Sequence, residues 1–521
     1  MSDPKLHRRQ FVLGPEPVLA DEGWLSEEIR PSLHLSRCPE LAVESVTDAR
    51  GRRWHLLGIA VQSAPGRPPP REQLAGLGSE NLLEAYGSWS GRWILVGESE
   101  LHLDASGLLG CFYRRVQRAP TPELWASSSP ALLATLPHRP RLRSTEPRIH
   151  WEKGMDWYPP PKSRFAGLSR LLPTQVLSLA PGRGEPVSAR PPLMPVPEPG
   201  SYEHTLDELQ RILLTSLANV RGRDEQLRLP LTAGLDSRLI LAAAREVGLR
   251  VSTFTFRYRS MPTGDRVLPP LLAGEVGYEH QFLGPGPLSR PRLALFDAHT
   301  AEHCVDIDRR FFARGQWSAF RPPALVLRGG VFEVGRCFYH RKFPDPTTDD
   351  LAETVATRFR FREFHAGSRA HLEGIGEWAE WVEQTPCPGL DWRDRLYLEQ
   401  RLGGWASSIE QALDLTAYER AYIANSHLYV STVLTLPEEV RLVGGHHVDL
   451  VRRMAPELLR FPFNPPDDAL VRLSFSVRNE WRELVARPRK VGYAVYVARR
   501  GVRSARRLTT RTVDRLQGYV R

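Results

Sequence analysis

The side chains with the clearest chemical potential lie in one short loop, L-T-A-G-L-D-S at positions 231–237. Ala233 and Gly234 are small, so a phosphate group can approach the backbone closely. Thr232 and Ser237 add hydroxyl donors. Asp236 would repel a phosphate unless a cation lay between them, and Mg²⁺ commonly bridges carboxylate and phosphate oxygens. The loop therefore predicts a phosphate site that works with Mg²⁺ bound at Asp236.

The elements around this loop place it where phosphates bind. An apolar run at 227–231 predicts a strand, residues 239–247 predict a helix, and residues 251–256 predict a second strand. This order is typical of a parallel α/β sheet. A loop between strand and helix presents backbone N–H groups to phosphate oxygens. The chain has no G-x-x-x-x-G-K-[ST] motif, so the loop is not a Walker P-loop.

The loop resembles the S-G-G-L-D-S pyrophosphate loop of the N-type ATP pyrophosphatases, and of the asparagine synthetase family in particular. Thr232 keeps the first hydroxyl and Ala233 replaces a glycine. Four further positions are identical: Gly234, Leu235, Asp236 and Ser237. The resemblance implies that ATP and Mg²⁺ bind here, with nucleotide contacts from Leu231 to Ser237.

The next segments follow the order of the same family. Residues 251–256 match the strand whose end holds the adenine, which implies a nucleotide contact at Phe256. Gly264 and Asp265 match the family's acidic residue ahead of a helix, and residues 276–280 match its glycine-ended turn.

A second loop, A-L-V-L-R-G-G-V-F-E at 324–333, resembles the family's S-G-E-G-A-D-E strand and loop. Gly330 and Glu333 keep its glycine-to-glutamate spacing, whereas Arg328 and Phe332 depart from it. The resemblance implies nucleotide contacts at Gly329 and Gly330. It also implies that Glu333 acts as a general base toward the attacking amine.

One late lysine stands out, because only five of the 70 basic residues are lysines. Residues 487–492, R-P-R-K-V-G, resemble the family's R-x-K-x-G segment, whose lysine lies near the adenylate. A compact ammonium can approach a developing negative charge as a point donor, and the planar fork of arginine cannot replace it. The resemblance implies that Lys490 stabilises the tetrahedral oxyanion.

The first part of the chain predicts a different architecture. Short apolar or alternating runs at 9–13, 54–61, 93–96 and 101–103 predict a layered sandwich of antiparallel sheets. Residues 82–113 resemble, more weakly, the class II glutamine amidotransferase domain, an Ntn-hydrolase fold, that precedes the ligase domain in asparagine synthetase.

We therefore expect an α/β protein of four segments. Residues 1–185 form a degenerate amidotransferase-like domain, and the proline-rich residues 186–200 form a linker. Residues 201–495 form an ATP-pyrophosphatase domain of the adenine nucleotide α hydrolase type, with a parallel sheet and flanking helices. Its first helix is expected at 202–220, and residues 390–485 are expected to be mainly helical. Residues 496–521 form a basic tail.

The amidotransferase resemblance lacks its nucleophile. That family needs a cysteine directly after Met1, but this chain has Ser2, and its first cysteine is Cys38. About seven polar residues separate Ser2 from the first predicted strand, so we expect the amino group to dangle rather than act as a base. The amine must then come from elsewhere. It is free ammonia, an intramolecular amine or a peptide amine, as in the related β-lactam synthetases and lasso-peptide cyclases.

The distribution of charge limits the kinds of binding partner that we expect, and the cysteines indicate the cellular compartment. Residues 487–521 contain ten arginines and Lys490 against one acid, Asp514, and so carry the whole net charge of +10. The near-neutral body argues against a general nucleic-acid binder. Five scattered cysteines without C-x-x-C spacing suit a reducing cytoplasm, and no apolar stretch predicts a signal peptide or a transmembrane helix. The tail is a solvated helix, a contact for an acidic substrate or carrier, or a contact for anionic membrane or nucleic acid.

The leading hypothesis is an amide-forming ligase that activates a small-molecule or peptide carboxylate as its acyl-adenylate and passes it to an amine. Two alternatives stay open. Ala233, Arg328 and Phe332 are compatible with a catalytically silent scaffold, and the basic tail is compatible with a tRNA-modifying ATP pyrophosphatase. The acid, the amine and the oligomeric state are not determined by the sequence.

We predict that the protein does not hydrolyse glutamine, because the cysteine after Met1 is missing. Incubation with glutamine, followed by an assay of glutamate, should give only the background rate. Glutamate release at a catalytic rate that disappears in a Ser2→Ala variant would contradict this prediction.

Overall fold

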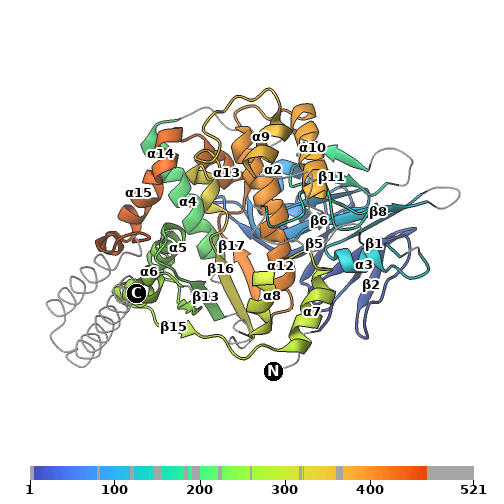
Figure 1. Ribbon diagram of the computed structural model, residues 1–521, viewed down its shortest axis with the longest axis horizontal. Helices are drawn as coiled ribbons and strands as arrows, with labels where there is room; N and C mark the ends of the chain where they lie inside the picture. The colour runs from blue at the N-terminus through green and yellow to red at the C-terminus, as the bar shows by residue number, and fades with distance from the viewer. Residues whose placement is uncertain are drawn as a thin grey trace, which may run out of the picture.

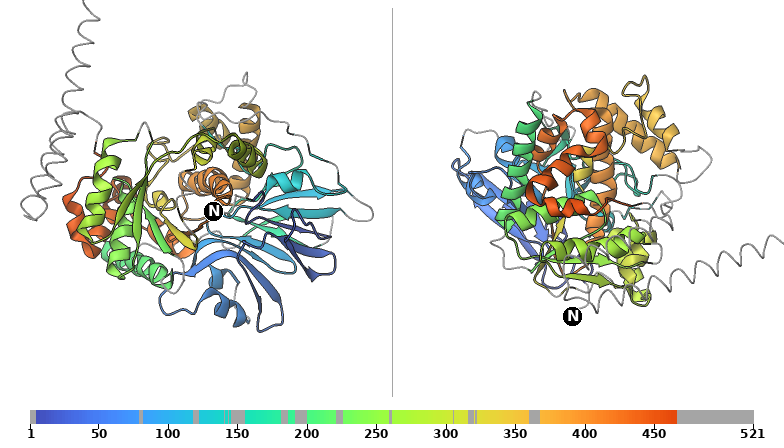
Figure 2. Two further views of the ribbon diagram at one scale, coloured as in Figure 1. Left: turned by 90° about the horizontal axis from the view of Figure 1, so that it is seen from below. Right: turned by 90° about the vertical axis from the view of Figure 1, so that its left-hand side faces the viewer.

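A computed structural model describes residues 5–78, 82–117, 122–139, 141–142, 144, 155–180, 186–190, 200–220, 226–258, 261–304, 306–315, 320, 322–359 and 368–465. The chain has two halves, which lie side by side in Figures 1 and 2. Antiparallel sheets make up the first half, and a parallel sheet flanked by helices makes up the second. The expected α/β class with these two kinds of sheet is therefore confirmed.

Two six-stranded antiparallel sheets pack face to face in the first half. Alternate residues of facing strands, such as Phe11 and Leu13 in one sheet and Ile94 and Val96 in the other, fill the core between them. The first sheet has the order β10 (Ser169–Arg170), β8 (Phe112–Val116), β9 (Glu123–Ser127), β1 (Phe11–Gly14), β3 (Leu33–Arg37), β2 (Leu25–Arg30). The second has the order β12 (Val187–Ala189), β11 (Gln175–Ser178), β7 (Glu100–Leu103), β6 (Trp89–Val96), β5 (Arg53–Gln62), β4 (Val43–Thr47). The helices here are short: α1 (Pro70–Ala75), α2 (Leu82–Tyr86) and α3 (Pro130–Ala134).

The proline-rich segment expected as a linker begins inside the second sheet. β12 pairs with β11, and the Arg190 N–H donates to the Thr174 carbonyl at 2.9 Å. The start of the expected linker is therefore part of the first half. Proline at 186 precedes the strand, where it removes no ladder hydrogen bond.

The second half contains a five-stranded sheet in which every neighbouring pair is parallel. Its order is β15 (His280–Leu283), β14 (Ser252–Phe256), β13 (Gln226–Pro230), β16 (Ala324–Arg328), β17 (Glu419–Tyr422). Leu325 and Leu327 pack into one apolar core, and Val326 between them packs into another on the opposite face. Burial of both faces explains why the A-L-V-L run of β16 is continuously apolar.

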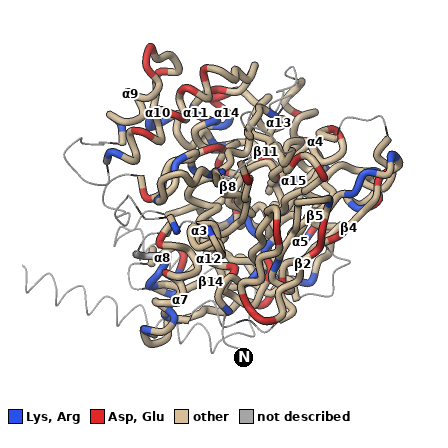
Figure 3. The backbone as a smooth tube through the Cα atoms, turned by 90° about the vertical axis from the view of Figure 1, so that its right-hand side faces the viewer, with Lys and Arg blue, Asp and Glu red and all other residues tan. Residues whose placement is uncertain are grey.

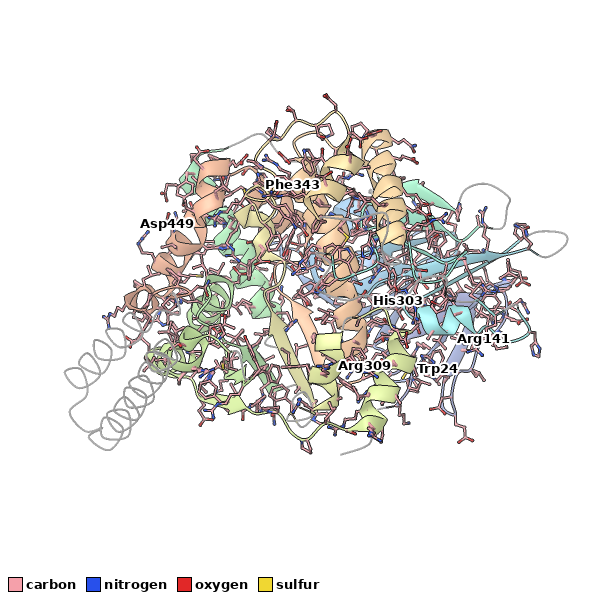
Figure 4. The ribbon with its side chains drawn as sticks, viewed as in Figure 1. Trp24, Arg141, His303, Arg309, Phe343 and Asp449 are labelled. Carbon is pink, nitrogen blue, oxygen red and sulfur yellow. The ribbon has the colours of Figure 1, made fainter. Side chains whose placement is uncertain are left out.

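Helices surround this sheet, as Figure 2 shows. Helix α4 (Tyr202–Val220) has the predicted bounds, and its buried side chains share a core with those of α5 (Leu235–Glu246). The other helices are α6 (Thr263–Glu275), α7 (Arg290–Thr300), α8 (Asp306–Ala313), η3 (Phe332–Arg336), α9 (Leu351–Arg358), α10 (Ser368–Gln384), α11 (Trp392–Arg395), the π-helix η4 (Leu396–Ala406), α12 (Ser407–Leu413), α13 (His427–Leu434), α14 (Glu438–Val443), α15 (Gly445–Met454) and η5 (Pro456–Arg460). Asp449, labelled in Figure 4, ties α15 to α4 by accepting a hydrogen bond from the Tyr202 hydroxyl at 2.7 Å.

The described segment before β1 is packed onto the second half. Arg9 is buried, and its guanidinium donates to the Glu419 carboxylate at 2.6 Å and to the Thr416 carbonyl at 2.7 Å. Gln10 is fully buried and donates to the Asp414 carboxylate at 2.9 Å. These contacts fix residues 9 and 10. The amino group that was expected to dangle is that of Ser2, so this expectation stays a prediction. Ser2 lies outside the described residues.

Buried charges join the two halves. Asp414 accepts two hydrogen bonds from Arg92 of β6, at 2.7 and 2.8 Å, and also pairs with Arg420 of β17. Arg420 in turn pairs with Glu410. Burial alone would raise the pKa of Asp414, but Arg92 and Arg420 outweigh it and hold this pKa below its usual value. His303, labelled in Figure 4, adds a second contact between the halves through the ring of Phe112.

The described part of the chain has mixed charge and no candidate membrane-spanning helix. Basic and acidic segments are interspersed over the face shown in Figure 3. No described helix combines the length and apolar character needed to cross a membrane. All five cysteines are free thiols.

We predict that Asp414→Asn lowers the free energy of unfolding by about 3–5 kcal/mol, because it leaves Arg92 and Arg420 buried without their full counter-charge. Urea denaturation at pH 7.5 provides the measurement. Glu373→Gln is the matched control, since it breaks an exposed pair with Arg369 and should cost less than about 1 kcal/mol. Equal effects of the two changes would contradict a special role for the buried cluster.

Candidate functional site

The predicted phosphate loop lies where the strand order of the parallel sheet reverses. From β13 the chain continues to β14 and β15 on one side, whereas β16 and β17 add to the other side. The loops that follow the neighbouring strands β13 and β16 therefore start side by side at the carboxyl edge of the sheet and lead away from each other. Ligands of open α/β sheets bind at such a switch point. Both predicted loops are thus brought to one place.

The loop after β13 is shaped by its own side chains. The Thr232 hydroxyl lies 3.0 Å from the Ser237 hydroxyl and accepts from the Gly234 N–H at 3.1 Å. The Ala233 N–H donates to the Asp265 carboxylate at 2.7 Å. Asp265, on the first turn of α6, therefore fixes the loop from outside.

Helix α5 begins directly after this loop without a side-chain cap. Gly234 is its N-cap residue in extended conformation, and no side chain among the described residues accepts from the first N–H groups of the helix. Uncapped N–H groups at a twelve-residue helix are ready donors for an anion. A side chain at Gly234 would place its Cβ 3.1 Å from the Thr232 hydroxyl, so glycine keeps the entrance to the helix open.

A buried arginine holds the back of the loop. Arg238 is fully buried, and its guanidinium donates to the carbonyls of Phe461 and Pro462 at 2.6 and 2.8 Å and reaches the Ala233 carbonyl at 3.4 Å. Burial lowers the pKa of Arg238 to about 9. The Asn464 N–H also donates to the Ala233 carbonyl, at 3.2 Å. The last described residues of the chain thus lie beside the loop.

The two predicted acidic residues meet through a third residue. One guanidinium nitrogen of Arg336 donates to the Asp236 carboxylate at 2.8 Å and to the Glu333 carboxylate at 3.2 Å. The Tyr397 hydroxyl, on the π-helix η4, lies 3.2 Å from the other Glu333 oxygen and 2.9 Å from the Gly330 carbonyl. π-Helical turns are rare and often occur at functional sites.

Several polar atoms around Asp236 are buried and have no hydrogen-bond partner among the residues that the structure describes. They include one Asp236 oxygen, the Tyr429 hydroxyl and both ring nitrogens of His446 and His447. Burial raises the pKa of Asp236 to about 6, opposed by Arg336 and reinforced by Glu333. Burial also lowers the pKa of His446 to about 3 and that of His447 well below its usual value, so both rings are neutral. Unsatisfied buried groups are costly, and their concentration here indicates a site built for a ligand.

The departures from the family's second loop have structural roles. Arg328 points to Glu410, 3.4 Å away, in the cluster that joins the halves. Phe332 is fully buried and packs edge-on against Tyr429 and His447. A Cβ at Gly329 would meet the Phe332 ring at 3.1 Å, so the glycine makes room for it. Neither residue blocks the loop.

The candidate site suits a metal ion that binds together with a phosphate-bearing ligand. Mg²⁺ is usually bound by one or two carboxylates, with water and phosphate oxygens completing its shell. Asp236 and Glu333 supply two carboxylates within reach of one point. No group of three or more His, Cys, Asp or Glu among the described residues is arranged to hold a metal alone. The donor set therefore fits Mg²⁺ bound together with a nucleotide.

The remaining predicted contacts divide into three groups. The side chains of Leu231 and Leu235 are buried, so these residues offer only their backbone. Phe256 ends β14, next to β13, and its ring contacts those of Phe254 and Phe311 at centroid distances of 5.2 Å. Lys490 lies outside the described residues.

Sequence reasoning missed Arg336, Tyr397 and His447. Arg336 follows Glu333 by three residues in a short helical turn, so this spacing was available as a signal. Tyr397 and His447 come from distant helices, and no local pattern marks them.

A scan against models of known protein families and a search of curated proteins find no match to this chain. The function must therefore be argued from the site itself.

We predict that Asp236→Asn stabilises the protein at pH 8. The folded-state pKa of Asp236, about 6, lies above its ordinary value, so ionisation costs stability as the pH rises through this range. Asparagine removes that cost, and the melting temperature should rise by about 2–4 °C at pH 8.

The gain should shrink toward pH 5, where the native aspartate is already protonated. Asp349→Asn, which removes an exposed carboxylate, should change little at either pH. Lower stability of Asp236→Asn at both pH values would show that Asp236 has a structural role.

Proposed function

We propose that this protein is an ATP-dependent amide-bond-forming ligase of the asparagine synthetase type. The observation that carries the proposal is the meeting of Asp236 and Glu333 with an uncapped helix N-terminus at the switch point of a parallel sheet. The order of the five parallel strands supports, as a proposal, an ATP-pyrophosphatase fold of the adenine nucleotide α hydrolase type.

The proposed reaction has two steps. A carboxylate oxygen of the substrate attacks the α-phosphorus of ATP, the bond from that phosphorus to the bridging oxygen breaks, and pyrophosphate leaves. The amine nitrogen then attacks the acyl carbon, the bond to AMP breaks, and Glu333 takes the proton that the nitrogen loses. Bound Mg²⁺ would neutralise phosphate charge between Asp236 and the nucleotide.

Each loop residue has a specific task in this proposal. The N–H groups at the start of α5 and the hydroxyls of Thr232 and Ser237 hold the departing pyrophosphate. Gly329 and Gly330 let the nucleotide approach the end of β16. Phe256 borders the adenine at the end of β14, adjacent to the loop strand.

Lys490 would stabilise the oxyanion of the second step. The described part of the chain ends beside the phosphate loop, where the Asn464 N–H donates to the Ala233 carbonyl at 3.2 Å. Pro465, the last described residue, lies beside Gly264, where an added Cβ would come within 2.9 Å of the proline ring.

The amine is proposed to arrive without hydrolysis of glutamine, as ammonia or as an amine of the substrate or a peptide. The first half would then act as a structural support. Its N-terminal segment is committed to buried contacts with Asp414 and Glu419, which supports this proposal.

We predict that the protein exchanges labelled pyrophosphate into ATP when given its acid, and that Asp236→Ala abolishes the exchange while the protein stays folded. The carboxylate is needed to keep Mg²⁺ next to the phosphates. Circular dichroism checks the fold, and Asp349→Ala is the matched control.

A panel of amino acids, small organic acids and peptides would be screened with Mg²⁺. Absence of nucleotide binding by calorimetry would support the silent scaffold and overturn the proposal. Exchange that depends on transfer RNA would favour the tRNA-modifying alternative.

A further inference from the structure

The Arg336 guanidinium occupies the point between the two site carboxylates. A cation that bridged Asp236 and Glu333 would compete for the same two oxygens, which lie 2.8 and 3.2 Å from a single nitrogen of Arg336. A metal ion and this nitrogen cannot share that point. Either the arginine leaves when the metal enters, or the metal does not enter.

We propose that Arg336 is a positioning residue that pairs with Asp236 and Glu333 until a nucleotide binds. Its side chain then moves to the phosphates of the nucleotide, and the two carboxylates would hold Mg²⁺. The identity of the ligand rests on the function proposed above. Arg336 thereby makes binding of metal and nucleotide interdependent: Mg²⁺ alone binds weakly, and the two together bind tightly.

The charges favour such an exchange. Two carboxylates face one guanidinium, so the group keeps one net negative charge. A bare divalent cation must displace Arg336 from both carboxylates. A nucleotide offers the displaced guanidinium a new anion, because arginine binds phosphate in a bidentate fashion.

The contacts around Arg336 allow its side chain to change direction. Its Nε is buried and has no hydrogen-bond partner in the described part of the chain. Its aliphatic stem lies over Gly444, where an added Cβ would come within 3.4 Å of the Arg336 Cδ. The Arg336 side chain is about a quarter exposed and pairs with Asp236, which lies in the first turn of α5. The movement is therefore a change of side-chain direction and needs no rearrangement of the backbone.

The exchange also has a consequence for Glu333. While it pairs with Arg336, one of its oxygens already accepts a hydrogen bond at 3.2 Å. Departure of Arg336 toward the phosphates would free Glu333 for the amine. General-base activity would thus be available only in the nucleotide-loaded site.

The test uses Arg336→Met, which keeps the length of the stem and removes the charge. Binding of Mn²⁺ in the absence of nucleotide is monitored by the loss of the free-ion electron paramagnetic resonance signal. The Mn²⁺ affinity should rise about tenfold or more, because the charged hydrogen bonds from Arg336 no longer compete for the carboxylates. The affinity of the same variant for Mg·ATP, measured by calorimetry, should fall about tenfold or more. Opposite changes in one variant are not expected from a purely structural arginine.

Arg341→Met is the matched control. It removes a nearby exposed arginine that donates to the Leu442 carbonyl and touches neither carboxylate, so both affinities should stay unchanged. Arg336→Gln repeats the test if the methionine variant does not fold. Unchanged or weaker Mn²⁺ binding in a folded Arg336 variant overturns the proposal. The Mn²⁺ titration needs no nucleotide, so it remains decisive even if the wild-type protein binds no ATP and the proposed function fails.

Discussion

The buried charge cluster centred on Asp414 and Arg420 is the interaction on which the rest of the structure depends. It receives Arg92 from the antiparallel half and Gln10 from the segment before β1. Through Glu410 it also reaches Arg328, the residue directly before Gly329. Charges buried this deeply are tolerated only when every partner is in place. The position of the loop that follows β16 therefore depends on contacts that begin in the other half of the chain.

This connection gives a physical reason for the packing of the front half against the parallel-sheet half. Arg92 and Gln10 supply polar groups that Asp414 needs, and removing that half would expose a face built to be buried. The antiparallel sandwich therefore contributes to the stability of the second half.

Sequence reasoning succeeded where local patterns determine the structure. Helix α4 has an uninterrupted apolar stripe, and the loop at 231–237 combines small residues, hydroxyls and an acid between a strand and a helix. Both were located correctly. The strand β17 was missed, because its sequence E-R-A-Y is short and charged, and its Arg420 is buried only through partners at Glu410 and Asp414.

The same limit applies to the site. Asp236 and Glu333 were predicted from motif spacing, and the fold brings them together. Tyr397 and His447 come from helices far along the chain, so only the tertiary structure places them. Arg336 has ordinary helical spacing from Glu333, but its second contact, to Asp236, spans 100 residues. Contacts of that separation leave no periodicity to detect.

Proteins are made from their N-terminus, and that gives the packed segment at residues 5–10 a role in timing. Arg9 cannot meet Glu419 until about 400 further residues have been synthesised, which takes on the order of 20–80 seconds at typical elongation rates. The antiparallel half is complete only after β12, so it waits for about 230 residues, or on the order of 10–50 seconds, with Arg9, Gln10 and Arg92 still in water. Ile59, Val61 and Leu108 of the same half share an apolar core with α4 and α5, so the waiting surface is partly polar and partly apolar. Its polar part stays hydrated until the second half covers it.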